Sequence, residues 1–275
     1  MTKTNNFLAA AIICLGLTTT AQATLAANSP QKDIFTSSQT NQNQISQNPT
    51  ARNYFEQGIS LYKKRDLAGA EEAFKQAIKI DPNYAPAYTG LGNVLDDQGK
   101  PSEAIAAYKK SLSIDRNSAW THFNLGVTLA RQGKIEEAIA SYKQAIRINP
   151  KYIEPHYELG NIYYDNKQFN LAIAEYEEVI RLDSNYVDAY IGLGNTLDDA
   201  GQPEQAITNY KKAIALAPNN PYGYYNLGIT LGRQNQFKEA VSALEKSRDL
   251  FEALGNTEKV QRLEQIIQRI NSRLS

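Results

Sequence analysis

A glycine that recurs at a fixed interval of 34 residues constrains the fold of this chain more than any other feature. The glycines are Gly58, Gly92, Gly126, Gly160, Gly194 and Gly228. A ring-bearing residue stands four positions before each one, namely Tyr54, Tyr88, His122, His156, Tyr190 and Tyr224. Self-similarity at this period indicates stacked repeats, in which each unit buries its apolar side against the next.

Each unit divides into two helical segments. Around Gly92, the apolar residues Tyr88, Leu91 and Leu95 fall at the spacing of one helix face. A glycine, which tolerates the left-handed conformation of a helix stop, then follows in three units, as Gly99, Gly133 and Gly201. A second apolar pattern follows, and three units close with a proline that cannot continue a helix, at Pro82, Pro150 and Pro218.

These columns resemble the tetratricopeptide repeat: aromatic-x-x-Leu-Gly-x-x-Leu, then alanine, an aromatic residue and proline. The resemblance covers residues 51–254 as six units without insertion, at 51–84, 85–118, 119–152, 153–186, 187–220 and 221–254. It implies an all-α fold, a right-handed superhelical solenoid of helix-turn-helix repeats. It also implies that the first helix of each unit lines a concave groove that holds partner proteins.

The first 23 residues have the pattern of a secretory signal peptide. Lys3 precedes an apolar segment from Phe7 to Leu17, and the small residues of Ala21-Gln22-Ala23 suit cleavage. The apolar segment is too short to span a bilayer. A lipoprotein acylated at Cys14 is the alternative, which the bulky Ile13 disfavours. We therefore expect an exported protein, periplasmic or extracellular, whose mature chain is not inserted in a membrane.

Two further segments flank the repeats. Residues 24–50 are rich in Gln, Asn and Ser and show no apolar period, which predicts a disordered linker. In residues 255–275, Thr257 is a candidate N-cap for a helix with one apolar stripe, formed by Val260, Leu263, Ile267, Ile270 and Leu274. We interpret this segment as a C-terminal capping helix over the last repeat, although a partner-binding helix would show the same pattern.

A longer period of 102 residues underlies the short one. Units 2 and 5 share Gly90/Gly192, Asn93/Asn195 and the pairs Asp96-Asp97/Asp198-Asp199. Units 3 and 6 share Asn-Leu-Gly and the arginines Arg131/Arg233. The array therefore looks like a duplicated set of three repeats, and we expect two similar surface patches three repeats apart.

By the resemblance, the groove carries amide and aromatic side chains. They are Asn93, Asn124, Asn161, Asn195, Asn226, Phe55, Phe123, Tyr157, Tyr225 and, at the inner lip, Trp120. An amide both donates and accepts hydrogen bonds, so it can hold the backbone of a peptide of any sequence, and rings add apolar contact. We expect capture of an extended or helical partner segment. The alternative is that the asparagines only solvate the inner wall.

Some members of the family clamp the carboxylate of a chain terminus with lysine, asparagine and arginine. The matching positions here are Thr89, Asn93, Asn124, Glu154 and Glu158. Because the cations are missing and two are replaced by acids, we expect no such clamp.

The two Asp-Asp pairs lie near the ends of first helices, where the helix dipole disfavours anions. We predict that an ion pair to the next unit compensates each one. The expected pairs are Asp97 with Arg131 and Asp199 with Arg233, each contributing a fraction of about 1 kcal/mol if exposed.

Composition narrows the function further. Lys and Arg together number 29, as do Asp and Glu, so the formal net charge is zero, which argues against nucleic acid as a partner. No arrangement of nucleophile and base, phosphate-binding loop or zinc-binding spacing is apparent. We therefore expect no cofactor, no metal and no enzymatic activity. The sequence predicts a protein–protein interaction scaffold in the cell envelope. The alternatives are a structural or self-oligomerising protein, or a noncatalytic subunit of an envelope complex.

Overall fold

The structure is a computed structural model, and it describes residue 46 and residues 48–274. The chain divides into two units, residues 1–43 and 44–275, and only the second is described below. The predicted signal peptide and most of the predicted linker lie outside the described residues.

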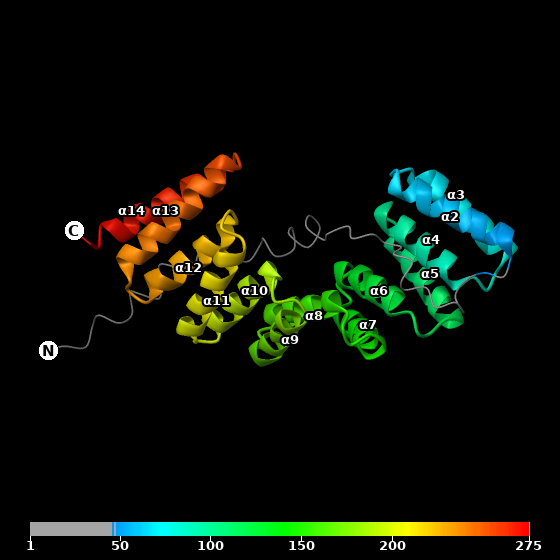
Figure 1. Cartoon of the computed structure of the whole chain (residues 1–275), viewed down its shortest axis with the longest axis horizontal. Coiled ribbons are helices and arrows are strands. Elements are labelled where there is room, and N and C mark those ends of the chain that lie inside the picture. Colours follow the sequence, from blue (N-terminus) through cyan, green and yellow to red (C-terminus); the bar gives the residue numbers. More distant parts are fainter. Residues whose placement is uncertain (1–45, 47, 275) are drawn as a thin grey trace. The chain divides into compact units, whose positions relative to one another are not determined.

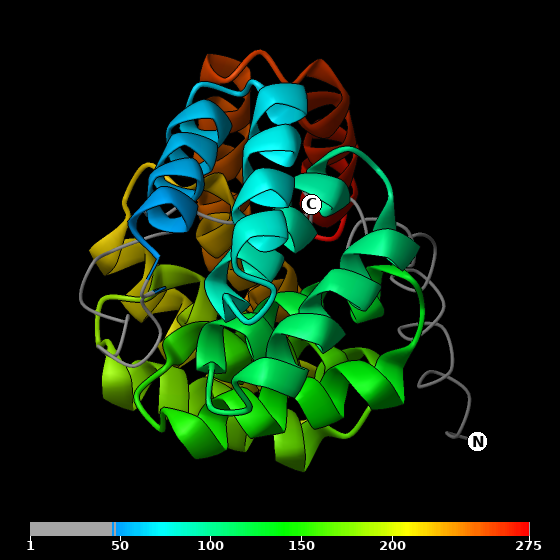
Figure 2. The ribbon, with the colours of Figure 1, turned by 90° about the vertical axis from the view of Figure 1, so that its right-hand side faces the viewer.

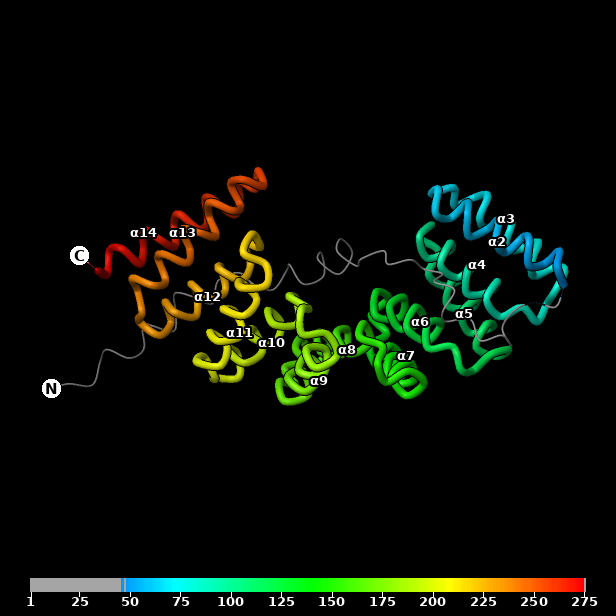
Figure 3. Tube along the Cα trace, viewed as in Figure 1, coloured from blue at the N-terminus to red at the C-terminus, as the bar shows by residue number. Residues whose placement is uncertain are grey.

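The described part of the chain is all-α and has no strand. Helices follow one another in sequence order through the stack (Figures 1 and 3). Six first helices, one per repeat, are α2 (Pro49–Lys63), α4 (Ala85–Asp97), α6 (Ala119–Arg131), α8 (Ile153–Asp165), α10 (Val187–Asp199) and α12 (Pro221–Arg233). The second helices and the last helix are α3 (Leu67–Ile80), α5 (Pro101–Ile114), α7 (Ile135–Ile148), α9 (Phe169–Leu182), α11 (Pro203–Leu216), α13 (Phe237–Ala253) and α14 (Thr257–Asn271).

Each first helix packs on the second helix of its own repeat, and each second helix packs on the next first helix. Figure 2 views this arrangement from the end at which α2 and α3 lie. First helices of neighbouring repeats also contact each other, as in α2 with α4, α8 with α10 and α10 with α12. The first helices therefore form the inner side of the stack, as the sequence resemblance implied.

Rings from the second helices fill the space that the glycine column leaves. Tyr142 is 1% exposed and lies against Gly126, where an added Cβ would come within 2.6 Å of the ring. The same aromatic position is buried in four further repeats, as Phe74, Tyr108, Tyr176 and Tyr210. The glycine is thus required for close helix approach, and the 34-residue period marks this contact.

The position two residues after the end of every first helix carries a residue with positive φ. Gly99, Gly133 and Gly201 occupy it with φ between 72° and 79°, as the sequence predicted. In the other three repeats Arg65, Lys167 and Asn235 adopt the same left-handed conformation, with φ of 63°, 58° and 59°. The backbone turn is therefore kept where the glycine is absent, at a steric cost that glycine would avoid.

Both ends of the array differ in detail from the sequence prediction. The linker was predicted to extend to residue 50, but α2 begins at Pro49, and the buried Ser46 hydroxyl lies 2.5 Å from the Asp81 carboxylate. These residues cap the first repeat and so belong to it.

At the other end, Asn256 rather than Thr257 is the N-cap of α14, since its side chain accepts from the Lys259 amide. Leu263 and Ile267 of α14 pack with Leu244 and Phe251 of α13. The helix therefore covers the apolar side of the last repeat.

Candidate partner-binding surface

The partly exposed residues of the first helices on the inner side of the stack form a surface that we call the inner face. Its middle carries a cluster of aromatic rings. Trp120 lies 6.1 Å from Phe123, and Phe123 lies 5.3 Å from Tyr152, measured between ring centroids. One repeat further on, Tyr157 lies 5.3 Å from Tyr186. The rings therefore form two groups in neighbouring repeats, the first on α6 and at the N-cap of α8, the second on α8 and at the N-cap of α10.

Of the predicted groove residues, Trp120 and Phe123 lie together in repeat 3 and Tyr157 lies in repeat 4, and each of the three is partly exposed. Tyr225 is also partly exposed, but it packs with the apolar cluster of α13 and α14, away from these rings. The remaining predicted ring, Phe55, is only 8% exposed and packs against Phe74 and Tyr84 in the core of the first repeats. Three of the five predicted aromatic residues are thus partly exposed in repeats 3 and 4.

The amide groups on the same helices form internal hydrogen bonds. The Asn93 side chain is 8% exposed, and its oxygen accepts from the Tyr108 hydroxyl at 2.8 Å and from the Asn124 amide at 3.0 Å. These bonds join the two helices of repeat 2 to the first helix of repeat 3. Holding the repeats together is therefore the observed role of the Asn93 oxygen.

The same arrangement recurs three repeats later. The Asn195 oxygen accepts from the Tyr210 hydroxyl and from the Asn226 amide, both at 2.9 Å. In repeat 4 the Asn161 oxygen accepts from Tyr176 at 2.7 Å. The partly exposed Asn124 and Asn226 still present their side-chain oxygens, which accept no bond within the described residues.

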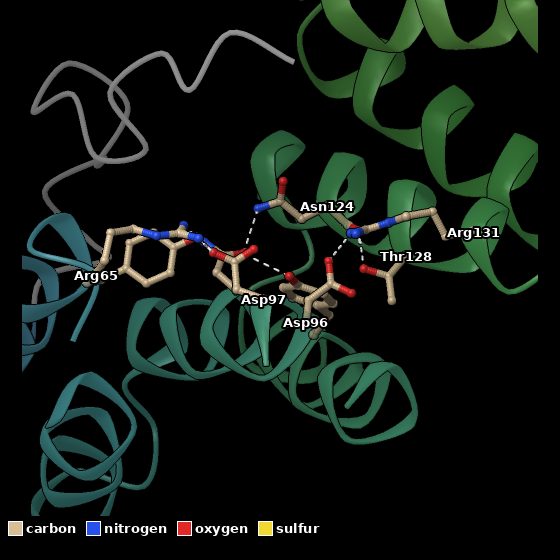
Figure 4. A network of polar contacts seen from close by, with 9 residues as sticks. Arg65, Asp96, Asp97, Asn124, Thr128 and Arg131 are labelled. Carbon is tan, nitrogen blue, oxygen red and sulfur yellow. Dashed lines mark hydrogen bonds and ion pairs between the residues drawn. The ribbon is translucent and has the colours of Figure 1, made fainter. Parts of the chain in front are cut away.

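The predicted ion pairs are wrong by one residue. Arg131 pairs with Asp96 rather than with Asp97, as Figure 4 shows. Arg233 pairs with Asp198 rather than with Asp199, at 2.7 Å. A shift of one residue turns a side chain by about 100° around a helix, and only the first aspartate of each pair faces the following repeat.

The second aspartate of each pair faces the preceding repeat. The Asp97 carboxylate accepts from the Tyr62 hydroxyl at 2.7 Å and pairs with Arg65 at 3.2 Å (Figure 4). Asp199 accepts from Tyr164 at 2.7 Å. Each Asp-Asp pair therefore ties one repeat to both of its neighbours.

This network confirms the 102-residue period at the level of individual contacts. No role was assigned to Tyr62 and Tyr164 from the sequence. Both are tyrosines, and they stand one 102-residue period apart, which is the sequence feature from which their equivalent roles could have been predicted. The two similar patches predicted three repeats apart are present, and their polar groups bond mainly to each other.

A group of acids on the inner face behaves differently. Glu154 and Glu158 lie one turn apart on α8, and Asp188 lies in the first turn of α10. Burial raises the pKa of Glu158 to about 7, against the opposing effect of the Asn161 amide. Burial also raises the pKa of Asp188. Within the described residues none of the three forms an ion pair, in contrast to Asp96 and Asp198.

The described residues can also be examined for metal binding and for membrane-spanning helices. No group of three or more His, Cys, Asp or Glu side chains there could hold a metal ion. Nor does any helix of residues 48–274 have the length and apolar character needed to cross a bilayer.

Comparison with protein families gives repeated matches along the array. The family described as TPR repeat matches residues 58–99, 92–133, 128–167, 160–201 and 194–235. The family described as tetratricopeptide repeat matches residues 221–259. A search of curated proteins gives no match.

Several solved structures are similar. A MamA protein is 29% identical, with a TM-score of 0.57 over 62% of this chain and 93% of its own. YrrB, described as a TPR protein with an unusual peptide-binding site, is 22% identical, with a TM-score of 0.61 over 71% of this chain and 100% of its own. PilF of Pseudomonas aeruginosa is 20% identical, with a TM-score of 0.66 over 78% and 96%. The last two likenesses show the fold alone.

Proposed function

Since this chain belongs to the tetratricopeptide repeat family, we propose that it is a non-enzymatic scaffold that binds a segment of a partner protein on its inner face. The observation that carries the proposal is that the rings of Trp120, Phe123 and Tyr157 are partly exposed on the first helices of the neighbouring repeats 3 and 4. Aromatic residues are enriched among those that contribute most to binding between proteins, because each ring buries a large apolar area.

The asparagines have a narrower part in this proposal than the sequence suggested. The oxygens of Asn93, Asn161 and Asn195 are engaged by buried hydroxyls, so they set the position of the helices. Asn124 and Asn226 are partly exposed, and their oxygens accept from backbone amides of the bound segment. Neighbouring repeats are held in place by Asp97, Arg131, Asp199 and Arg233. These four residues affect partner binding only through the positions of the helices.

The similarity to YrrB supports the proposal. YrrB is described as a TPR protein with a peptide-binding site, and its structure aligns with 71% of this chain. Export to the periplasm or the medium is part of the proposal and rests on the first 23 residues of the sequence. Self-association on the inner face is the alternative.

Site-specific photo-crosslinking tests the proposal. A photoreactive phenylalanine analogue is placed at Trp120 on the inner face or at Leu171, which is 49% exposed on the second helix α9. The full chain is then irradiated in its native cells. We expect a crosslinked product with another protein from position 120 and none from position 171. Equal products from both positions would contradict inner-face binding, and a product of twice the chain's mass from position 120 would favour self-association.

A further inference from the structure

The two halves of the duplicated array differ in charge at one place on the inner face. Six residues before the motif glycine, repeat 1 has Arg52 and repeat 4 has Glu154. Two residues before it, both repeats have glutamate, as Glu56 and Glu158. In repeat 1 the charges of Arg52 and Glu56 act on the Tyr84 hydroxyl in opposite senses. The chain thus supplies a cation beside Glu56, whereas at Glu158 it supplies a second acid.

Three acids lie on the neighbouring helices α8 and α10 of repeats 4 and 5. Tyr157, one position before Glu158 on α8, lies 5.3 Å from the ring of Tyr186, which precedes Asp188 by two residues. The charges of Asp188, Glu154 and Glu158 all act to raise the pKa of the Tyr186 hydroxyl. No Lys or Arg of the described residues forms an ion pair with these three acids, whereas Asp96, Glu178 and Asp198 each have one. Glu154 and Glu158 are partly buried, where an uncompensated carboxylate is costly, and a cation from outside would relieve that cost.

Aromatic faces border the same acids. Tyr157, between Glu154 and Glu158 on α8, lies 5.3 Å from Tyr186 and 6.0 Å from Tyr176. A Lys or Arg side chain over a tyrosine ring is attracted by the negative face of the ring. Rings and carboxylates together therefore match both the apolar stem and the charged end of a basic side chain.

A buried donor without an acceptor adjoins this surface. Tyr152 is 7% exposed, and its hydroxyl has no hydrogen-bond partner within the described residues. The charge of Glu154 acts on that hydroxyl, so the two groups are close. The indole nitrogen of Trp120, in the same ring cluster, is also buried and without a partner there. Buried donors are normally paired, so these two show that the chain leaves polar groups unsatisfied beneath this part of the inner face.

We propose that the surface of Glu154, Tyr157, Glu158, Tyr186 and Asp188 binds a lysine or arginine side chain of the partner segment. This inference rests on the proposed function and specifies the partner as a basic protein segment. The carboxylates provide the charge complementarity, and the rings provide the apolar contact.

Selection of peptides tests the inference. The full chain is used to select from a library of random dodecapeptides, and the affinity of an enriched peptide is measured by fluorescence anisotropy. We expect enriched peptides to carry Lys or Arg at a fixed position. The Glu154→Gln/Glu158→Gln variant should bind the peptide about tenfold more weakly or worse, because it loses the charges that pair with the basic side chain.

A matched control removes the same number of charges elsewhere. Glu136→Gln/Glu177→Gln changes two exposed acids on the second helices α7 and α9, and its affinity should equal that of the wild type. Thermal unfolding followed by circular dichroism establishes that both variants are folded.

The outcomes separate this inference from the proposed function. Enriched peptides that lack basic residues and bind the double variant as tightly as the wild type would overturn the inference and leave inner-face binding intact. Failure of the chain to enrich any peptide would contradict both. Sedimentation could instead detect self-association in the wild type and not in the double variant. That result would assign the basic segment to a second copy of this chain and overturn the proposal that it belongs to a different protein.

Discussion

At the scale of single residues, the inner face combines side chains that hold the repeats together with side chains that are free to bind. The Asn161 oxygen accepts from the Tyr176 hydroxyl, which belongs to a ring that is 1% exposed. Asn161 had been predicted as a contact for the partner, and its hydrogen bond assigns it to the structure of its own repeat. The neighbouring Glu158 has only the Asn161 amide to offset its burial.

Replacing Asn161 by leucine should destabilise the fold by about 1–3 kcal/mol, because the buried Tyr176 hydroxyl loses its acceptor. Tyr176→Phe should cost less, about 1 kcal/mol, because the asparagine is partly exposed and can bond to water. Urea unfolding measures both. The double variant should be more stable than Asn161→Leu alone, whereas simple addition of the two single losses would contradict this role.

Glu158 predicts a dependence of stability on pH. Its folded pKa of about 7 lies above the unfolded value of about 4.3, so between these values the folded state binds more protons. Stability contributed by the protonated carboxyl is therefore present below about pH 4.3 and is lost as the pH rises through about 7. The groups that face it are Tyr142, Tyr157, Tyr176 and Tyr186, and since burial raises the pKa of each one, they stay neutral over this range.

Glu158→Gln should consequently raise the free energy of unfolding at pH 8 and change it little at pH 4.3. Urea titrations at the two pH values measure the difference. An equal effect at both would show that the carboxyl ionises as it does in the unfolded chain.

At the scale of helices, the separation of each pair depends on the glycine column. Gly126→Ala should destabilise repeat 3 by about 1–3 kcal/mol, because the added methyl group would meet the Tyr142 ring at 2.6 Å. Gly232→Ala is the matched control on α12, where the nearest atom would lie at an ordinary 3.7 Å. It should be neutral or slightly stabilising, since alanine favours helix more than glycine does. Thermal unfolding of the two variants checks this, and equal losses would contradict the packing role of the column.

The last helix should stabilise the array through its buried side. Leu263→Ala removes a side chain that is 1% exposed against α13, with an expected local cost of about 2–5 kcal/mol. Leu274→Ala, at a residue 46% exposed, should cost almost nothing. Hydrogen exchange should locate the loss in α13 and α14, because repeats interact only with their neighbours. A loss spread evenly over all six repeats would refute this.

At the scale of the whole molecule, the sequence predicted the repeats well and their polar contacts only in part. The 34-residue period reports close contacts such as Gly126 with Tyr142, which every repeat must make, so it identifies the helices and their pairing. Aspartate contacts depend on direction around the helix, and a period does not reveal whether Asp96 or Asp97 faces forward. The acids at Glu154 and Glu158 were visible only as departures from a known clamp, because their significance depends on the absence of a nearby cation.

The central claim, that a partner segment binds on the inner face, is tested most directly by the fluorescence of Trp120. It is the only tryptophan of the chain and lies in the ring cluster. The full chain is titrated with a selected basic peptide while tryptophan emission is recorded. The account predicts a saturable change in emission with the same Kd as the labelled peptide gives by anisotropy. Binding detected by anisotropy with no change in Trp120 emission would place the peptide elsewhere and contradict the account.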